Sequence, residues 1–362
     1  IIHNIRVKGF FMKKIAALLW DESFLWGLMA YKTLKRLSLP FDLVRSDEIK
    51  KGILKDYKML FVPGGWASNK LKKLGEYGAE EIKRYIKNGG NYFGICGGAG
   101  LATLDGIGLL NIKRKTSKER VPSFSGRIYL NITEHPLWDN LVKAKYPLPI
   151  SNNNSICNFK DAVIFHAWWP SQFIISDKEI SVLAIYGSAL PDAFSSDLNV
   201  GDVESKANWK IFEELYQINL NPKRLLNETA VVEGRYGKGK VILSLIHFDT
   251  PNDNIGAVVL ENIWEYLTGH KTKVNSNEKC KDLFKEKNNF YLTSQTYQIL
   301  LEIETAITDL IDLGMRNFLW FWRNPMLLQW RRGVRGLEYG TLYVMIREIT
   351  DILKRSWPPC FT

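Results

Sequence analysis

The chain has 362 residues, of which 46% are hydrophobic and 24% charged, a composition that fits a globular protein and excludes a disordered or fibrous one. Its net charge of +11 comes from the first third, because residues 1–120 hold 23 basic and 11 acidic side chains. These basic residues are spread along segments such as KTLKR and NKLKK without interleaved aromatic side chains. That spacing favours solvated helix faces, and we expect no nucleic-acid partner.

The sequence also limits the metal sites, the compartment and the membrane contacts that we expect. The four cysteines form no CxxC pair and no Cys/His cluster at zinc spacing: Cys96, Cys157, Cys280 and Cys360. We therefore expect no metal, no cofactor and a reducing, cytoplasmic environment. Residues 1–11 lack the regions of a signal peptide, and we expect a non-native or disordered extension before a start at Met12. No apolar run reaches the length of a membrane span, which predicts no transmembrane segment.

The N-terminal part of the chain alternates short apolar runs with helical patterns. Apolar side chains at three-and-four spacing predict helices at 24–37 and 78–90, and a glycine pair closes the second helix. Strands that alternate with helices in this way are typical of a mostly parallel sheet with helices on both faces. The strands predicted in this part are 14–20, 41–46, 59–65 and 91–96, and a helix or turn is predicted at 97–110.

The middle of the chain is instead a run of predicted strands joined by polar turns. YGKGK at 236–240 is a hairpin signal, and a helix at 255–269 closes this part at a glycine. Such strands either extend the sheet antiparallel or build a flanking cover, and the sequence leaves both open. The predicted strands are 127–133, 161–169, 181–187, 230–237 and 240–248.

The sequence changes character after a polar linker. Amphipathic patterns at 297–314 and 337–355 predict helices there. The aromatic and basic segment 318–335 between them has three interpretations: packing of a helical appendage onto the main domain, a homodimer interface, or a peripheral membrane contact. The predicted organisation is an extension at 1–11, a main domain at 12–270, a linker at 271–280 and an α-helical C-terminal region at 281–362.

Three motifs follow apolar strands and contain residue types used in catalysis. They are PGG at 63–65, GIC at 94–96 and SLIHFDTP at 244–251. In open parallel sheets, ligands bind at the carboxyl ends of the strands. We therefore expect the three motifs to meet at one edge of the sheet.

Glycines on both sides of Cys96 allow a strained corner between a strand and a helix. Such a corner projects the side chain into solvent at a helix N-terminus, where the partial positive charge favours a thiolate. The amide of Gly97 and a second amide from Gly64 or Gly65 would then form an oxyanion hole. The sequence therefore predicts a cysteine nucleophile; the alternative is a small buried cysteine in a tight turn.

His247 is the expected base, and Asp249 could orient its imidazole ring. The alternative for His247 is a histidine with satisfied hydrogen bonds at a strand end. Several further residues are candidates for a substrate pocket, because they lie near a motif or a strand end or because they could line the cleft with an aromatic ring. They are Asp21, Glu22, Trp66, Gly98, His166 and Trp168. For the two acids a solvated helix start is the alternative, and for His166 an aromatic core position.

The order of PGG, a GxCxG about thirty residues later and a late histidine with an acid two positions on resembles the class I glutamine amidotransferase-like superfamily. Within it, GICGGAGLA, HPLWDN and GRYGKGKVILSLIHFDTP most resemble the biotin-protein ligase N-terminal family. The resemblance covers roughly residues 13–270. It implies an α/β, flavodoxin-like three-layer sandwich with Cys96, His247 and Asp249 in the catalytic positions.

The chain departs from that superfamily in informative ways. Glutaminases of the superfamily carry a glutamine four residues after the nucleophile, and this chain has Gly100 there. The acid two positions after His247 is Asp249, whereas the superfamily has glutamate there, and the aspartate side chain is one methylene shorter. No GRGR-type adenylate loop and no synthetase domain are recognisable in the sequence. The resemblance therefore implies the fold without implying ordinary glutamine hydrolysis.

Two functions follow from these patterns. The first is a cysteine-dependent amidohydrolase or amidotransferase-like enzyme that attacks an unknown amide-type substrate, either a small molecule or a peptide, by a Cys-His-Asp mechanism. The second is a non-catalytic binding or regulatory module that retains the amidotransferase-like fold. A homodimer through the C-terminal helical region is compatible with either.

Overall fold

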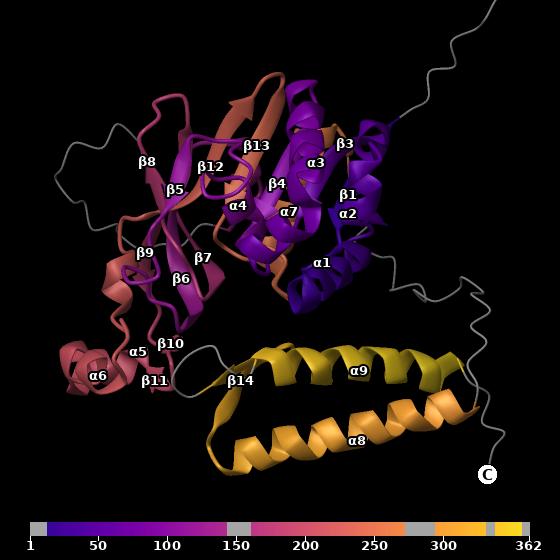
Figure 1. Ribbon diagram of the computed structural model, residues 1–362. Helices are drawn as coiled ribbons and strands as arrows, with labels where there is room; N and C mark the ends of the chain where they lie inside the picture. Colours follow the sequence, from indigo (N-terminus) through magenta and orange to yellow (C-terminus); the bar gives the residue numbers. More distant parts are fainter. Residues whose placement is uncertain (1–12, 143–160, 272–293, 331–336, 357–362) are drawn as a thin grey trace, which may run out of the picture.

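A single mixed sheet forms the centre of the main domain in the computed structural model, which describes residues 13–142, 161–271, 294–330 and 337–356 (Figure 1). Five of its strands are mutually parallel and lie in the order β13-β4-β3-β1-β2. Their bounds are β1 Lys14–Leu19, β2 Asp42–Val44, β3 Tyr57–Val62, β4 Asn91–Ile95 and β13 Gly239–Ser244. The inner strands are continuous apolar runs because both of their faces are covered.

Helices cover both faces of these parallel strands. The β1-α1-β2 and β2-α2-β3 crossovers run in opposite directions along the sheet, so their right-handed connections place α1 and α2 on opposite faces. Helix α3 packs beside α2. Trp264 of α7 donates to the carbonyl of Pro40 after α1, at 3.2 Å. The helices are α1 Phe24–Arg36, α2 Ser46–Lys50, α3 Ala67–Lys87 and α7 Asn254–Thr268.

Helix α3 starts earlier than its apolar pattern indicates. The pattern predicts a helix from residue 78, whereas α3 begins at Ala67 and is kinked at Gly75, where φ is 62°. Gly75 can adopt this backbone conformation because it has no Cβ. The extra turns position the segment that follows the PGG motif.

The strands of the middle part extend the sheet antiparallel, which decides between the two arrangements that the sequence leaves open. β12 pairs with β13 through the predicted YGKGK hairpin, and β9, β6 and β7 continue the sheet. The strands are β6 Phe124–Ile132, β7 Asp161–Trp168, β9 Ser181–Ala189 and β12 Thr229–Tyr236, with the short β5 Ile112–Arg114, β8 Phe173–Ile175, β10 Phe194–Ser195 and β11 Leu198–Asn199. Two short helices, α5 Val200–Lys206 and α6 Trp209–Tyr216, follow β11. The predicted α/β sandwich is confirmed, with its parallel part limited to the five strands above.

The C-terminal part is a pair of long helices that lies beside the main domain (Figure 1). Helices α8 (Ser294–Arg316) and α9 (Leu337–Ser356) pack against each other, and Glu304 of α8 forms ion pairs with Arg347 and Lys354 of α9. The predicted helical extension is confirmed. Between the helices, the chain forms the hairpin β14 (Trp320–Asn324) and β15 (Leu327–Trp330), which is absent from the sequence-based expectations.

The hairpin attaches the C-terminal part to the main domain. Met326 and Leu327 are buried in an apolar cluster with Trp26 of α1 and Trp168 of β7. Gln329 is completely buried; its amide donates to the carbonyl of Ser123 at 2.7 Å and accepts from the Ser125 hydroxyl at 2.5 Å. For residues 318–330, the structure therefore shows the first of the three interpretations, packing onto the main domain.

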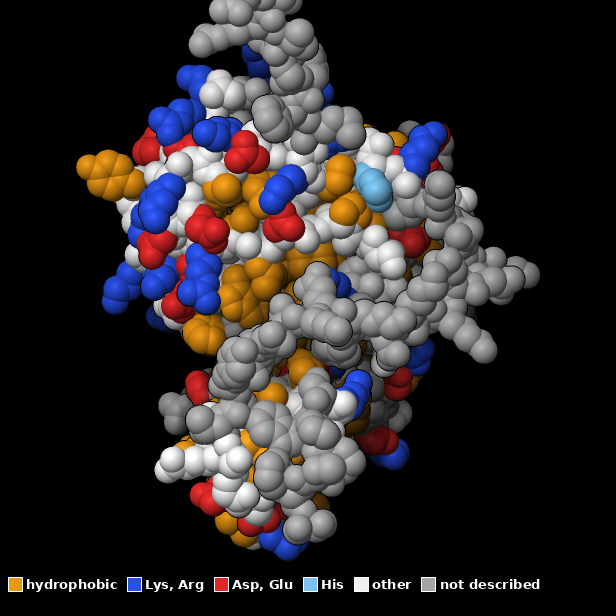
Figure 2. All heavy atoms as spheres, turned by 90° about the vertical axis from the view of Figure 1, so that its right-hand side faces the viewer, with side chains coloured by type: hydrophobic (Ala, Val, Ile, Leu, Met, Phe, Trp, Pro, Cys, Tyr) orange, Lys and Arg blue, Asp and Glu red, His pale blue; other side chains and the backbone are white. Residues whose placement is uncertain are grey.

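On the face of the molecule in Figure 2, Lys and Arg side chains are interspersed with Asp and Glu side chains. Charges of both signs cover this face, and hydrophobic side chains are visible between them.

Among the described helices, none combines the length and the apolar character needed to cross a bilayer. The predictions for residues 1–11, for Met12 and for most of the linker at 271–280 lie outside the described residues.

The packing of the hairpin predicts the effect of truncating Leu327. Because Leu327 is buried in the cluster with Trp26, replacing it with alanine leaves a cavity, and we expect Leu327→Ala to lower the free energy of unfolding by about 2–5 kcal/mol. The matched control is Leu342→Ala on α9, because Leu342 is 46% exposed and its truncation should cost less than about 0.5 kcal/mol. Urea denaturation measures both, and equal effects would contradict the docking of the hairpin.

Candidate functional site

The PGG turn and the turn after β4 are in direct backbone contact. A Cβ on Gly97 would overlap with the carbonyl oxygen of Gly65, and one on Gly98 would overlap with that of Val62. Only glycine fits at these two positions, since any side chain would collide with backbone atoms that cannot move aside. Two of the three predicted motifs therefore meet at the carboxyl ends of β3 and β4.

Cys96 stands at the corner between β4 and the short helix α4 (Gly97–Leu101). Its φ is 51° and its ψ is −105°, a backbone conformation that a residue with a side chain rarely adopts. The amide of Cys96 donates to the carbonyl of Ser244 at 2.7 Å, which connects the corner to the end of β13. Cys96 retains some solvent exposure. The strained corner that the glycine pattern predicts is present.

The third motif brings His247 and Asp249 to the same edge, because both follow β13. Nδ1 of His247 lies 2.9 Å from Oδ1 of Asp249, and both side chains are completely buried. The shorter aspartate side chain therefore reaches the ring. Trp26 stacks on the imidazole with 4.5 Å between ring centroids, and a Cβ on Gly64 would lie 3.1 Å from the ring's Cε1.

Charge couples Cys96 to His247. Burial alone would raise the pKa of the Cys96 thiol, but its interaction with His247 and the positive charges of His247 and Arg114 lower that pKa below its usual value. Burial alone would lower the pKa of His247, but the negative charge and hydrogen bond of Asp249, aided by Cys96, raise it to about 9. Nε2 of His247 has no hydrogen bond of ordinary geometry within the described residues. The two pKa shifts act in the same direction, since both favour a charged pair of Cys96 and His247.

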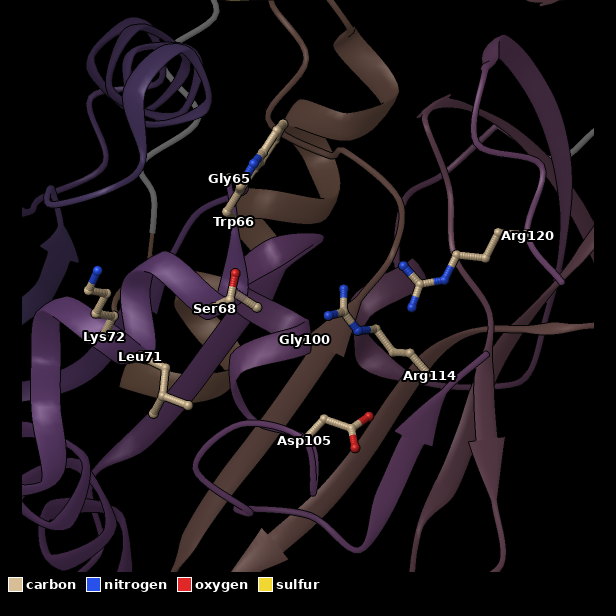
Figure 3. Close-up of a pocket in the computed structure, with 10 residues that line it drawn as sticks. Gly65, Trp66, Ser68, Leu71, Lys72, Gly100, Asp105, Arg114 and Arg120 are labelled. Carbon is tan, nitrogen blue, oxygen red and sulfur yellow. The ribbon is translucent and has the colours of Figure 1, made fainter. Parts of the chain in front are cut away.

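A pocket of about 600 Å³ opens beside this corner (Figure 3). Gly65 and Gly100 form its inner wall, and Arg114 and Arg120 project into it from the segment that includes β5. The rest of the wall comes from the start of α3 and the loop after α4: Trp66, Ala67, Ser68, Leu71, Lys72 and Asp105. Of the side chains considered for a substrate pocket, the structure brings Trp66 to this one.

The other residues considered for the pocket lie elsewhere around the site. Gly98 is buried in the contact with β3. Trp168 is buried in the cluster with the C-terminal hairpin, and its indole donates to Thr250 at 2.9 Å. Nδ1 of His166 pairs with Asp253 at 2.9 Å, and the His166 ring stacks on Trp168. His166 therefore belongs to a second histidine–aspartate pair, separate from that of His247.

Asp21 and Glu22 lie between β1 and α1, close to the PGG turn. The Asp21 carboxylate accepts from the amide of Ser46 at 2.7 Å, an interaction that fits a structural role at the start of α2. The carbonyl oxygen of Glu22 faces Gly65, and φ of Glu22 is 55°. Neither acid lines the pocket beside Cys96.

Lys70, which is absent from the residues expected at the site, is buried next to this corner. Its Nζ donates to the Ser23 hydroxyl at 2.5 Å and to the Asp21 carbonyl at 3.4 Å. Burial lowers the pKa of Lys70 to about 7, although the negative charges of Glu22, Cys96 and Asp21 act in the opposite direction. No sequence signal marks this lysine, because its helix carries several lysines and only the fold determines which one is buried.

Within the ranges that the structure describes, no group of three or more His, Cys, Asp or Glu side chains is arranged to hold a metal ion. The polar groups next to the corner include the thiol of Cys96, the imidazole of His247 and backbone amides. They can supply a nucleophile, a proton donor and backbone amides for a developing negative charge.

Lys70 predicts a specific pH dependence of stability. Its pKa is about 7 in the folded state and 10.5 in the unfolded chain, so between these values the unfolded state binds more protons and stability rises with pH. Compared with Lys70→Met, the wild type should gain up to about 2 kcal/mol in the free energy of unfolding between about pH 7 and pH 9. Urea denaturation at both pH values measures this gain. The matched control is Lys72→Met, since Lys72 is exposed; a gain that persists in Lys70→Met would contradict the assignment.

Comparison with known proteins gives a family match for the segment that contains the corner. Residues 44–105 match the model of the family described as "Biotin-protein ligase, N terminal". This segment includes β3, the PGG turn and Cys96. No curated protein sequence matches the chain significantly.

Solved structures that are similar to this one include three whose sequence identities lie below 20%. They are PurLQS from Thermotoga maritima (17% identity, 71% of this chain and 100% of that chain, TM-score 0.42), a protein from Thermoplasma acidophilum described as a putative subunit of GMP synthase (12%, 71% and 95%, TM-score 0.44) and a glutamine amidotransferase (18%, 70% and 99%, TM-score 0.40). Identities this low say nothing about activity. Over residues 44–105, the resemblance that the motifs predict is confirmed: this segment is similar to the biotin-protein ligase N-terminal family.

Proposed function

We propose that the protein is a cysteine-dependent hydrolase or amidotransferase-like enzyme that attacks the carbonyl carbon of an amide-type substrate. Cys96 is the nucleophile, His247 the acid and base, and Asp249 the residue that orients the imidazole. The observation that carries the proposal is the strained backbone of Cys96 at an edge that also holds a buried His247–Asp249 pair. Strain of this kind persists where the surrounding structure enforces it, and it is concentrated at functional sites.

The first half of the proposed reaction forms an acyl-enzyme. The Cys96 thiolate attacks the carbonyl carbon, a C–S bond forms, and the π electron pair moves to the oxygen. Amides of Gly97 and of Gly64 or Gly65 stabilise that oxyanion. The imidazolium of His247 then gives its Nε2 proton to the amine nitrogen as the C–N bond breaks, and the amine leaves.

The second half regenerates the enzyme. Neutral His247 takes a proton from water, the resulting hydroxide attacks the acyl carbon, and the C–S bond breaks to release a carboxylic acid and the thiolate. Asp249 accepts a hydrogen bond from Nδ1–H throughout, which keeps Nε2 directed toward the reacting atoms. Trp26 limits rotation of the ring by stacking on it.

A second candidate function is a binding or regulatory module that keeps the corner without turnover. Two observations favour it. The position where glutaminases carry a glutamine is Gly100, and Arg114 occupies the adjacent space. In addition, Nε2 of His247 lacks a hydrogen bond of ordinary geometry among the described residues.

Alkylation of Cys96 by iodoacetamide distinguishes the two candidates. If His247 holds Cys96 as a thiolate, His247→Ala should react at least about tenfold more slowly than the wild type at pH values below the ordinary pKa of a thiol, because each unit of pKa changes the thiolate fraction tenfold. Mass spectrometry of the Cys96 peptide gives the rate separately from the three other cysteines in the sequence.

The matched control for this measurement is His270→Ala. His270 follows α7, near the start of β3 and so at the opposite end of the parallel strands from Cys96. Its removal should leave the alkylation rate unchanged. Equal rates for wild type and His247→Ala across the pH range would show an ordinary thiol, and the binding module would then be the better description.

A further inference from the structure

We propose that the pocket beside Cys96 is an anion-binding subsite, and that the protein acts on substrates with a carboxylate or phosphate group a few bonds from the reacting carbonyl. This inference rests on the proposed function for the reaction itself. The binding of the anion rests only on the pocket, so the two can be tested separately. The residues that carry it are Arg114, Arg120 and Gly100 (Figure 3).

Two arginine side chains line the pocket without an acidic partner. Within the described part of the chain, neither Arg114 nor Arg120 forms an ion pair, and Nε of Arg114 is buried without a hydrogen-bond partner. Arg120 donates from Nε to the carbonyl of Lys115 at 2.6 Å, which leaves the other guanidinium nitrogens directed into the pocket. Guanidinium groups with unused donors are the side chains best suited to bind carboxylates and phosphates.

The two guanidinium groups are close enough to repel each other. Burial and then the positive charge of Arg114 lower the pKa of Arg120, and the negative charges of Cys96, Asp105 and Glu119 act in the opposite direction. Holding two like charges together in a partly buried place is costly unless an anion lies between them. Asp105 is on the pocket wall but forms no ion pair with either arginine among the described residues, so the pocket keeps an excess of positive charge.

Gly100 explains why Arg114 can occupy this place. A Cβ at residue 100 would overlap with the Arg114 guanidinium, so any larger residue would displace the arginine. The position four residues after the nucleophile is therefore used here to admit a charged group from β5. Where glutaminases have the side-chain amide of a glutamine, this site has the guanidinium group of Arg114. We therefore expect this site to select a different substrate.

One wall of the pocket lies within a single helical turn of Cys96, although Cys96 itself does not line the pocket. The amide of Gly100 donates to the carbonyl of Cys96 at 2.9 Å, so the two residues are one helical turn apart, or about 5 Å along the axis. Gly65, whose carbonyl contacts Gly97, forms another part of the wall. We therefore expect a substrate with its carbonyl at Cys96 to reach the arginines with a group that is a few bonds away.

Binding is tested first with a protein that cannot react. Cys96→Ser should be stabilised against thermal unfolding by glutarate or by inorganic phosphate, whereas the neutral isostere glutaramide should have no effect. Stabilisation by glutarate alone identifies a carboxylate site, and stabilisation by phosphate alone identifies a phosphate site. If neither anion stabilises the protein, or if glutaramide does so equally, the proposal is overturned.

The arginines are tested by the relative alkylation rates of Cys96 with iodoacetate and iodoacetamide, which differ in charge. The wild type should prefer iodoacetate, and Arg114→Gln or Arg120→Gln should lower the ratio of the two rates about tenfold. Arg235→Gln is the matched control, because Arg235 is exposed at the β12–β13 hairpin, at the opposite end of the sheet from Cys96. This substitution removes the same charge as those at Arg114 and Arg120. A ratio that falls equally in Arg235→Gln would contradict a specific subsite.

The outcomes separate this inference from the proposed function. If iodoacetamide reacts in a manner that depends on His247 but no anion binds, the reactive thiol stands and the anion subsite falls. If anions bind through Arg114 and Arg120 but Cys96 is an ordinary thiol, the subsite stands and the protein is a binding module. Because Arg114→Gln removes a partly buried side chain, the Arg120→Gln variant and the unfolding temperature without ligand show whether a loss reflects folding.

Discussion

The contact between two glycine turns is the constraint on which the site depends. Gly97 and Gly98 press their backbones against Gly65 and the end of β3, where no side chain fits. This contact fixes the path of the chain between β4 and α4, and the residue at the corner must then adopt a positive φ. Cys96 occupies that corner, so the thiol is held at the same edge of the sheet as the residues after β13.

Burial and charge then determine what the thiol can do. His247 and Asp249 are withdrawn from water. Burial alone would lower the pKa of the imidazole, but the charge and hydrogen bond of Asp249, together with Cys96, raise that pKa to about 9. Trp26 connects this pair to the rest of the molecule, since it stacks on His247 and packs against residues of the C-terminal hairpin. The C-terminal hairpin therefore belongs to the same apolar cluster as the indole that stacks on His247.

Features that depend on local patterns can be predicted from the sequence. Apolar runs reveal the parallel strands, and the glycines around Cys96 reveal the corner, because each signal lies within a few residues. The burial of Lys70 and the position of Arg114 depend on how distant elements pack, and one sequence holds no record of that. The β14–β15 hairpin is missed for a related reason: its tryptophans suggest burial but not the element that buries them.

The central claim is that His247 lowers the pKa of Cys96 and so stabilises its thiolate. The most direct measurement is the ultraviolet absorbance of the thiolate as a function of pH, taken as the difference between the wild type and Cys96→Ser. We predict that the absorbance appears at a lower pH in the wild type than in His247→Ala. A single step near the ordinary pKa of a thiol, at the same pH in both proteins, would contradict the claim.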